Sequence, residues 1–439
     1  MPVVLNRKIS KKEMMILHFL YKVRGATNIQ IVKGLGYALT VSNEKNMYKP
    51  LNKLIKENLV DFIFLKTDER RFYFLSEEGF EFMKRILDVK PFHYGTGYNK
   101  DFGDFDYKLH KPPTLQSRHF VMQVDSIIEI ENLKKMDIQV NGHFNLDYRD
   151  NRYCSTRFEL KKDDGSIVHC IFKPDGELMF STFDSEGTLT STNVYSIEVD
   201  TGSERKSKLL NKFETYKQYF DYLTAYNKPL PKGILFIGDV KEHQIGLESR
   251  WATLTDAFNQ ALGTYSDRVN LHYVTMDNLK PLLYREILYK TDTPKILKRI
   301  STSVLANPNF KGESMFYFGK RILRYDGFMP VTMYEPPVGK SVLYCYIRVD
   351  GFETLGWYEL RRFLEYFETE KSMVERYAKY KRVIPIVYFF NKPGPIIEPK
   401  FFKNYPSLKI DELIYYDAKN ELWFNQKMQQ LSTLPLPRK

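Results

Sequence analysis

The chain reads Lys173-Pro174-Asp175-Gly176 and, further on, Val194-Tyr195-Ser196-Ile197-Glu198-Val199-Asp200. The second stretch alternates apolar and polar residues, which predicts a strand, and Thr201-Gly202-Ser203 ends it. We expect Asp175 on one strand and Glu198 on the next, with both carboxylates on the same side. Two acidic oxygens that converge in this way bind a hard divalent ion, which polarises a phosphodiester and activates water.

Helix and strand patterns surround these stretches in a defined order. Periodicity predicts a helix over 117–132, strand-like segments over 156–160, 168–173, 177–183 and 194–200, a helix with Leu209, Phe213, Tyr216 and Phe220 on one stripe, and an apolar strand over 234–237. This order resembles the α/β core of the restriction endonucleases, the PD-(D/E)XK fold. That pattern has a lysine two residues after the second acid, whereas this sequence has Asp200. Lys212 on the following helix could return an ammonium to the site, and Lys208, one turn earlier, is the second candidate.

These residues define a candidate nuclease site. The predicted catalytic residues are Asp175, Glu198, Asp200 and Lys212, and the predicted metal ligands are Asp175 and Glu198, with Mg²⁺ or Mn²⁺ as the cofactor of an active enzyme. The Val199 carbonyl is a further candidate ligand. In the alternative interpretation, Pro-Asp-Gly is an ordinary turn, Glu-x-Asp is a solvated strand end, and the protein needs no cofactor.

A different pattern occupies the first 90 residues. Ser10-Lys11-Lys12-Glu13 and Thr27-Asn28-Ile29-Gln30 are capping boxes, which predict the starts of two helices. A third helix is expected over about 43–58. Pro50 lies inside it and removes a backbone donor, so the helix is expected to begin near Met47.

Two strand-like stretches, 60–65 and 71–75, follow this third helix, and Ser76-Glu77-Glu78-Gly79 begins a fourth helix. Three helices and a two-stranded wing resemble the winged helix-turn-helix, in which the third helix enters the major groove. Residues 1–60 carry eleven Lys and Arg against three acidic residues, which favours DNA as the partner. The predicted DNA-contacting residues are Lys45, Asn46, Lys49, Asn52, Lys53, Arg70 and Arg71. The alternative is a winged helix that serves dimerisation or protein docking.

Residues 91–116 lack periodicity and are rich in His, Gly, Tyr and Pro. They are typical of a connector or of an arm that wraps another domain. His93, His110 and His119 are too scattered to be predicted as metal ligands, and we expect them to be surface or connector residues.

The last third of the chain repeats the pattern of the first stretches. Tyr325-Asp326-Gly327 parallels the Asp175 segment, and Tyr346-Ile347-Arg348-Val349-Asp350-Gly351 parallels the Glu198 segment. The two aspartates are 25 residues apart in the first copy and 24 in the second. Since Arg348 replaces Glu198, the second copy cannot assemble the metal site, and it is predicted to be a degenerate copy that acts as a binding platform. There, Arg361 and Arg362 replace Asn211 and Lys212.

A family resemblance rests on three motifs. Lys173-Pro174-Asp175-Gly176, then Ile197-Glu198-Val199-Asp200-Thr201-Gly202-Ser203-Glu204, then Lys212-Phe213-x-x-Tyr216 resemble the replication-relaxation family of plasmids and related mobile elements over about residues 10–290. The resemblance implies a winged helix joined to a nuclease-like domain, and DNA binding in replication, transfer or copy control. It does not imply cleavage, because an aspartate replaces the lysine in such sequences too. Double-stranded DNA is the expected partner, with replication or transfer proteins and a homodimer left open.

Composition narrows the class of protein. The 439 residues carry a net charge of +12, with 15% aromatic residues and three cysteines, Cys154, Cys170 and Cys345. Apolar runs are too short for a membrane span, the cysteines have no zinc-finger spacing, and no P-loop motif occurs. We therefore expect a cytoplasmic protein. Its predicted α/β organisation is a winged helix over 1–90, a linker over 91–116, a nuclease-like domain over 117–292 and a degenerate copy over 293–439. The first predicted function is a DNA-binding protein of a plasmid, phage or other mobile element that acts in its replication, relaxation or transfer, and its sharper form is a metal-dependent endonuclease. The alternative is a non-enzymatic DNA-binding replication initiator or transcription regulator that uses an inactive nuclease fold as a scaffold.

Overall fold

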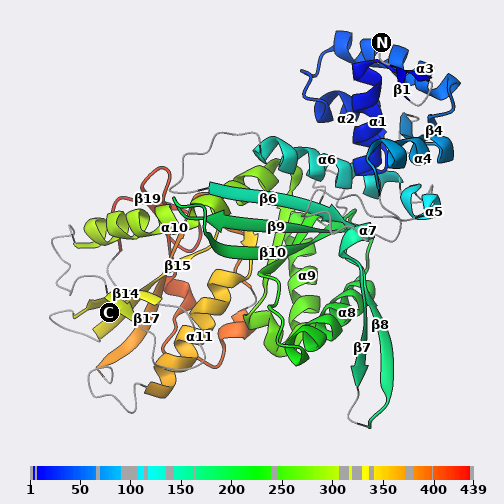
Figure 1. The fold of residues 1–439 in the computed structure, drawn as a ribbon. Coiled ribbons are helices and arrows are strands. Elements are labelled where there is room, and N and C mark those ends of the chain that lie inside the picture. The colour runs from blue at the N-terminus through cyan, green and yellow to red at the C-terminus, as the bar shows by residue number, and fades with distance from the viewer. Residues whose placement is uncertain are drawn as a thin grey trace. The chain divides into compact units, whose positions relative to one another are not determined.

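The computed structural model has a mixed α/β architecture with helices and several β-sheets, which confirms the predicted fold class at this level (Figure 1). The structure describes residues 3–4, 7–65, 70–89, 106–112, 117–134, 143–161, 164–238, 246–305, 316–318, 329–335, 341–370, 379–397 and 399–435. Among the helices of these segments, none has the length and apolar character that a membrane crossing requires.

The chain folds into two compact units. The first contains Met1–Glu204, Gln218–Glu242 and Thr275–Pro281, and the second contains Arg205–Lys217, His243–Val274 and Leu282–Lys439. The domain boundaries predicted near residues 90, 116 and 292 divide the chain more finely than these two units do, and they stay predictions.

The N-terminal part of the first unit follows the sequence pattern closely. Its elements are α1 (Lys11–Val23), β3 (Ala26–Thr27), α2 (Asn28–Gly34), α3 (Val41–Lys56), β4 (Val60–Phe64), β5 (Arg71–Leu75) and α4 (Glu77–Ile86). Both predicted capping boxes form, Ser10 with Glu13 and Thr27 with Gln30, and Ser76 caps α4. The three strands make one antiparallel sheet in the order β3-β5-β4.

Helix α3 corrects one expectation. It begins at Val41, capped by Thr40, and runs through Pro50 without a break in the assigned helix, so the predicted start near Met47 is wrong. Proline lacks the amide that would bond to the carbonyl four residues earlier, that of Asn46. Lys12 Nζ donates to this Asn46 carbonyl over 3.5 Å, which partly replaces the missing bond.

The body of the first unit is built on a sheet. Its elements are α6 (Ser117–Lys134), β6 (His143–Asp150), β9 (Gly176–Phe183), β10 (Leu189–Asp200), α8 (Lys206–Ala225) and β11 (Gly233–Gly238). The strands lie in the order β6-β9-β10-β11. The first three are antiparallel, and β10 is parallel to β11, which the chain reaches through α8. Helix α6 contacts β6 and β10. Strand β6 is not among the strands predicted from the sequence.

Smaller elements complete this unit. They are β1 (Val3–Val4), β2 (Arg7–Lys8), α5 (Tyr107–His110), α7 (Asn151–Cys154), β7 (Thr156–Lys161) and β8 (Ile167–Phe172). Strands β7 and β8 form a separate antiparallel hairpin that extends away from the sheet beside α8 (Figure 1). Most of the predicted linker lies outside the described residues, His93 included, whereas Asp106–Lys111 contains the short helix α5.

The second unit contains a larger sheet. Its elements are α9 (Leu247–Leu262), η4 (Gly263–Asp267), β12 (Asn270–Thr275), α10 (Met276–Leu305), β13 (Phe316–Phe318), β14 (Met329–Tyr334), β15 (Ser341–Arg348), β16 (Phe352–Glu353), α11 (Leu355–Glu370), β17 (Tyr380–Phe389), η5 (Pro399–Phe402), η6 (Ile410–Glu412), β18 (Ile414–Asp417), β19 (Leu422–Phe424) and β20 (Gln430–Leu431). The sheet order is β13-β14-β15-β17-β18-β19-β20, and β12 pairs with β16.

The strand pairing of the first unit recurs in the second. Strand β15 is antiparallel to β14 and parallel to β17, which the chain reaches through α11. Alternate residues of β15 enter two apolar clusters: Leu343, Cys345 and Ile347 pack with residues of α11, and Val342, Tyr344 and Tyr346 pack with residues of α10. Helices therefore cover both faces of this strand. The predicted counterpart of Asp175, in 325–327, lies outside the described residues.

Candidate functional site

Asp175 lies in the turn immediately before β9, and not on a strand as the sequence predicted. Its carboxylate nevertheless reaches the neighbouring strand, because the Val199 amide donates a hydrogen bond to Asp175 Oδ2 over 2.9 Å. His119 Nε2, from α6, lies 2.9 Å from the same oxygen. The turn, β10 and α6 together fix the position of this carboxylate.

Glu198 and Asp200 occupy the end of β10. Gly176 pairs with Ile197, so that Glu198 is the next residue along the strand beside Asp175. Glu198 and Asp200 are two positions apart, so their side chains leave the same face, and both are buried. Asp200 Oδ1 accepts a hydrogen bond from the Gly202 amide over 2.9 Å, which stabilises the turn after the strand. Three of the four predicted catalytic residues therefore belong to one small region of the first unit.

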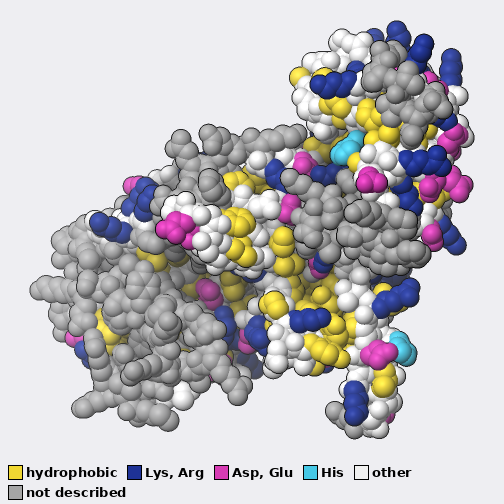
Figure 2. All heavy atoms as spheres, viewed as in Figure 1, with side chains coloured by type: hydrophobic (Ala, Val, Ile, Leu, Met, Phe, Trp, Pro, Cys, Tyr) yellow, Lys and Arg dark blue, Asp and Glu magenta, His cyan; other side chains and the backbone are white. Residues whose placement is uncertain are grey.

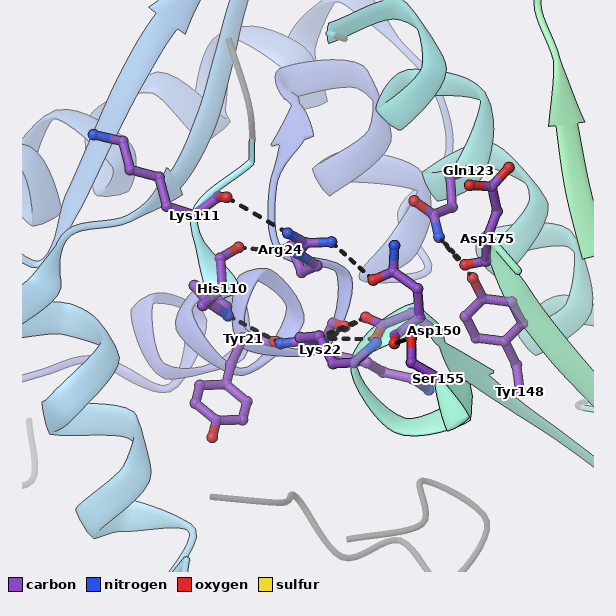
Figure 3. A network of polar contacts seen from close by, with 12 residues as sticks. Tyr21, Lys22, Arg24, His110, Lys111, Gln123, Tyr148, Asp150, Ser155 and Asp175 are labelled. Carbon is purple, nitrogen blue, oxygen red and sulfur yellow. Dashed lines mark hydrogen bonds and ion pairs between the residues drawn. The ribbon is translucent and has the colours of Figure 1, made fainter. Parts of the chain in front are cut away.

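The backbone at Asp175 and Gly176 lies against two side chains, Gln123 of α6 and Tyr148 of β6. Gln123 Nε2 donates to the Asp175 carbonyl over 2.7 Å and to Tyr148 Oη over 3.1 Å, as the labelled side chains in Figure 3 show. Gly176 has no space for a side chain, since an added Cβ would lie 2.7 Å from Tyr148 Oη. The glycine of the Pro-Asp-Gly motif thus permits the close approach of Tyr148 on β6.

Lys212, the fourth predicted catalytic residue, lies in the part of α8 that belongs to the second unit. His119, which was not predicted as a site residue, contacts the Asp175 carboxylate through Nε2. A signal for it existed, because His119 and Gln123 are four residues apart and therefore share one face of the predicted helix. Both contact Asp175 from that face.

The described residues contain no cluster of three or more His, Cys, Asp or Glu side chains that could hold a metal ion. A magnesium ion needs fewer protein ligands, since it commonly uses one or two carboxylates and fills its other positions with water and substrate phosphate. Asp175 and Glu198 supply oxygen donors of this kind from adjoining backbone segments. The donor type therefore fits the predicted cation.

The predicted DNA-contacting residues divide into two groups. Lys45, Asn46, Lys49 and Asn52 are exposed on α3, opposite the buried Met47, Leu51 and Leu54. Lys53, in contrast, pairs with Glu13 over 2.8 Å and with Glu57 over 3.6 Å, and these contacts, the Glu13 hydrogen bond first, raise the pKa of Lys53. The first four side chains face solvent, whereas Lys53 serves to attach α3 to α1.

The two wing arginines also differ. Arg70 is exposed, whereas Arg71 is half-buried and its guanidinium lies 4.4 Å from the centre of the Phe62 ring. The turn over 66–69 that joins the two strands lies outside the described residues. Figure 2 shows Lys and Arg side chains over the N-terminal helices, among apolar and acidic ones.

A buried polar cluster joins the N-terminal helices to the sheet of the first unit. Arg152 pairs with Asp150 over 2.6 Å and donates to the Lys22 carbonyl over 2.9 Å, at the end of α1. Arg24 donates to the His110 carbonyl over 3.0 Å and to Asn151 Oδ1 over 3.2 Å (Figure 3). Asp150 is the residue of β6 that pairs with Gly176, so this cluster ends beside the Asp175 turn.

His110 belongs to this cluster and is fully buried, so it lies in the predicted linker but is not a surface residue. Burial and the charges of Arg152 and Arg24 lower the pKa of His110 well below its usual value. Since Arg152 Nη1, 3.0 Å away, can only donate, the neutral imidazole accepts at Nδ1. Burial likewise lowers the pKa of Arg24, to about 10, and this side chain stays charged at neutral pH.

Comparison with models of known protein families gives no match for this chain, and comparison with curated proteins gives none either. The resemblance to the replication-relaxation family therefore stays a prediction.

Proposed function

We propose that this protein binds double-stranded DNA through an N-terminal winged helix. The order α1-β3-α2-α3-β4-β5 and the sheet β3-β5-β4 support this assignment, with α3 as the recognition helix. The observation that carries the proposal is the solvent face of α3, where two lysines and two asparagines are exposed. Lysines neutralise phosphates and asparagines bond to adenine in the major groove, so this face offers both kinds of contact.

The remainder of the chain supports a nuclease-like body in two copies. The order α6-β6-β9-β10-α8-β11, with three antiparallel strands and a parallel fourth, resembles the restriction-endonuclease-like core. The elements α10-β13-β14-β15-α11-β17 repeat this order and pairing. Together with the family resemblance, these features favour a cytoplasmic DNA-binding protein of a plasmid, phage or other mobile element that acts in replication, relaxation or transfer.

Metal-dependent cleavage of DNA is the second candidate function, favoured by the bond that ties Asp175 to β10. Asp175 and Glu198 would hold a Mg²⁺ or Mn²⁺ ion, which when bound supplies charge to polarise a phosphodiester. His119 would keep Asp175 Oδ2 in place, and Gln123 would keep its backbone in place. Participation of Lys212 stays a prediction. If the protein does not cleave, the body is a scaffold for a non-enzymatic initiator or regulator.

DNA binding is tested by fluorescence anisotropy with a labelled duplex of mixed sequence. Wild-type protein is compared with Lys45→Ala/Lys49→Ala and with the control Lys419→Ala/Lys427→Ala, whose lysines are equally exposed in the second unit. We expect the α3 variant to bind at least about tenfold more weakly, because each lost phosphate contact costs several-fold near 0.1 M salt. An absence of binding by wild-type protein, or equal affinities of all three proteins, would contradict the proposal.

Cleavage is tested by incubating supercoiled plasmid with the protein and Mn²⁺. Asp175→Asn and Glu198→Gln should abolish nicking, whereas Glu186→Gln, at an exposed position in the turn between β9 and β10, should not change it. Nicking that survives both active-site substitutions comes from another site or from a contaminant. A complete lack of nicking by the wild-type protein would favour the non-enzymatic role.

A further inference from the structure

The β7–β8 hairpin has one covered face and one open face. Phe158 and Phe172 lie on the covered face, where the Phe172 ring stacks on Tyr219 of α8 with 4.0 Å between ring centres. Phe158 lies 5.0 Å from Tyr222 by the same measure. Burial raises the pKa of Tyr219 to about 12, as expected for a phenol inside an apolar contact. This packing fixes the hairpin and leaves its opposite face to solvent.

The open face is basic and partly apolar. Its exposed residues, which we call the ribbon face, are Arg157, Glu159, Lys161, Ile167, His169, Ile171 and Lys173. Ile167 and Ile171 are 59% and 57% exposed, unusually high for isoleucine. Figure 2 shows Lys and Arg side chains along this hairpin beside acidic, His and apolar ones. The one acidic residue of the ribbon face, Glu159, lies 3.1 Å from His169 Nδ1.

Cross-strand pairing arranges these side chains in rows. Arg157 stands opposite Ile171, and Lys161 stands opposite Ile167. A strand rises about 3.3 Å per residue, so the two cations are roughly 13 Å apart along β7. The major groove of DNA is about 12 Å wide and admits a two-stranded ribbon, so cations at this spacing could reach the phosphates on both sides of the groove.

The hairpin is an addition to the first copy of the fold. It occupies the connection between β6 and β9, where Asp150 and Gly176 are the facing ends of the two strands. Between β13 and β14, the corresponding strands of the second unit, the sequence has only ten residues, 319–328, which lie outside the described part of the chain. Lys173 and Asp175 lie in the segment that leads from the hairpin to β9, so the ribbon face begins at the candidate site.

We propose that the ribbon face is a second DNA-binding surface, with Arg157 and Lys161 on phosphates and Ile167 and Ile171 against base edges in the major groove. Three cations against one carboxylate favour a polyanion over a protein partner. Exposed isoleucines suit the methyl group of thymine. This inference rests on the proposed DNA-binding function and extends it to a second element.

The test measures DNA affinity by anisotropy as a function of salt for wild-type protein, Arg157→Ala/Lys161→Ala and the control Lys419→Ala/Lys427→Ala. The slope of log affinity against log salt should decrease in magnitude by about 2 in the ribbon variant, since each phosphate contributes about 0.9. Affinity near 0.1 M salt should fall by roughly tenfold to sixtyfold. Glu159→Gln should bind more tightly than wild type. All substituted side chains are exposed, and equal melting temperatures verify folding.

Three results separate this inference from the proposed function. An unchanged slope and affinity in the ribbon variant, together with a loss in Lys45→Ala/Lys49→Ala, would overturn the ribbon inference alone. A loss in the ribbon variant with none in the α3 variant would support the ribbon and contradict the winged-helix assignment. If Ile167→Ser/Ile171→Ser weakens DNA binding while Arg157→Ala/Lys161→Ala keeps the affinity and salt slope of wild type, the hairpin touches DNA without the proposed phosphate contacts, and the inference as stated is overturned.

Discussion

Strand β10 of the first unit ends in Glu198-Val199-Asp200, whereas β15 of the second unit ends at Arg348, two residues before Asp350. Arg348 Nε donates to Asp350 Oδ2 over 2.8 Å, and the Phe390 amide donates to Asp350 Oδ1 over 2.6 Å. In the second unit, an ion pair within the chain thus satisfies the charged side chains at the end of the strand. In the first unit, the Asp175 carboxylate of the preceding turn is bonded by the Val199 amide and contacted by His119.

The comparison shows that the polar side chains at the two strand ends are satisfied in different ways. A buried Arg–Asp pair has its charges neutralised, and it needs no ligand. Arg361, further along the second unit, also has partners within the protein, because it pairs with Asp267 and its guanidinium lies over the Phe401 ring. These contacts within the protein argue for a structural role of Arg348 and Arg361, in place of the phosphate contact that the sequence suggested.

The largest expected effect is on stability in the second unit. Arg348→Ala would remove the guanidinium that pairs with the buried Asp350 carboxylate, at a cost of about 3–5 kcal/mol in the free energy of unfolding. Asp175→Ala, at a partly exposed position, should cost only about 1–2 kcal/mol, the value of a lost hydrogen bond. Urea denaturation of both variants measures the difference. Equal losses would mean that Asp175 is as structural as the Arg348 pair.

The next largest expected effect is a loss of stability when either of two glycines is replaced by alanine. An added Cβ at Gly356 would collide with the carbonyl oxygen of Arg348, which is backbone and cannot move aside. At Gly176 it would meet the hydroxyl end of the buried Tyr148 ring, a side chain that can give way more than a backbone carbonyl can. We therefore expect Gly356→Ala to cost about 3 kcal/mol and Gly176→Ala about 1 kcal/mol, within the range for overpacking. Thermal unfolding of the two variants checks this order, and the reverse order would contradict it.

The buried cluster of the first unit should make stability depend on pH through His110. The folded pKa of His110 lies below the usual 6.5, so the neutral form stabilises the protein above pH 6.5, and this contribution is lost as the pH falls below that value. The loss should be about 1.4 kcal/mol per pH unit until the folded pKa is reached. The guanidinium groups of Arg24 and Arg152 act on the imidazole, and both keep their charges over this range.

The measurement is the denaturation midpoint of wild-type protein and His110→Leu between pH 7.5 and pH 5.5. The variant should be less stable at pH 7.5 but should lose less on acidification. Parallel pH profiles of the two proteins would contradict the assignment.

The smallest expected effect separates two lysines of α3. Lys53→Met should cost at most about 1 kcal/mol of stability, because its partner Glu13 is buried but Lys53 itself is partly exposed. Lys49→Met should change stability by less than about 0.5 kcal/mol and should weaken DNA binding more than Lys53→Met does. Thermal melts of both variants measure the change in stability, and anisotropy measures the change in DNA affinity.

Local signals predicted most of the secondary structure. The capping boxes at Ser10 and Thr27, the apolar stripe of α8 and the alternation of β10 are all properties of neighbouring residues. Strand β6 was missed although Phe144, Leu146 and Tyr148 alternate with polar residues. This period of two is itself typical of a strand, so the signal for β6 is present in the sequence.

Such local patterns do not predict contacts between residues that are far apart in the sequence. His119 and Asp175 are 56 residues apart, and Arg24 and Asn151 are 127 apart. No local period encodes these distances, which depend on how α6, α7 and the strands pack. The burial of His110 and the pairing of Lys53 with Glu13 depend on tertiary packing in the same way.

The salt dependence of DNA binding by the full chain tests the central claim most directly. With lysines and arginines on phosphates, the affinity should fall steeply as salt rises, and the slope for Lys45→Ala/Lys49→Ala should be smaller in magnitude by about 2. If the affinity for duplex DNA is undetectable at 0.05 M salt, or if it is the same at 0.05 and 0.2 M, the protein does not bind DNA in the way described.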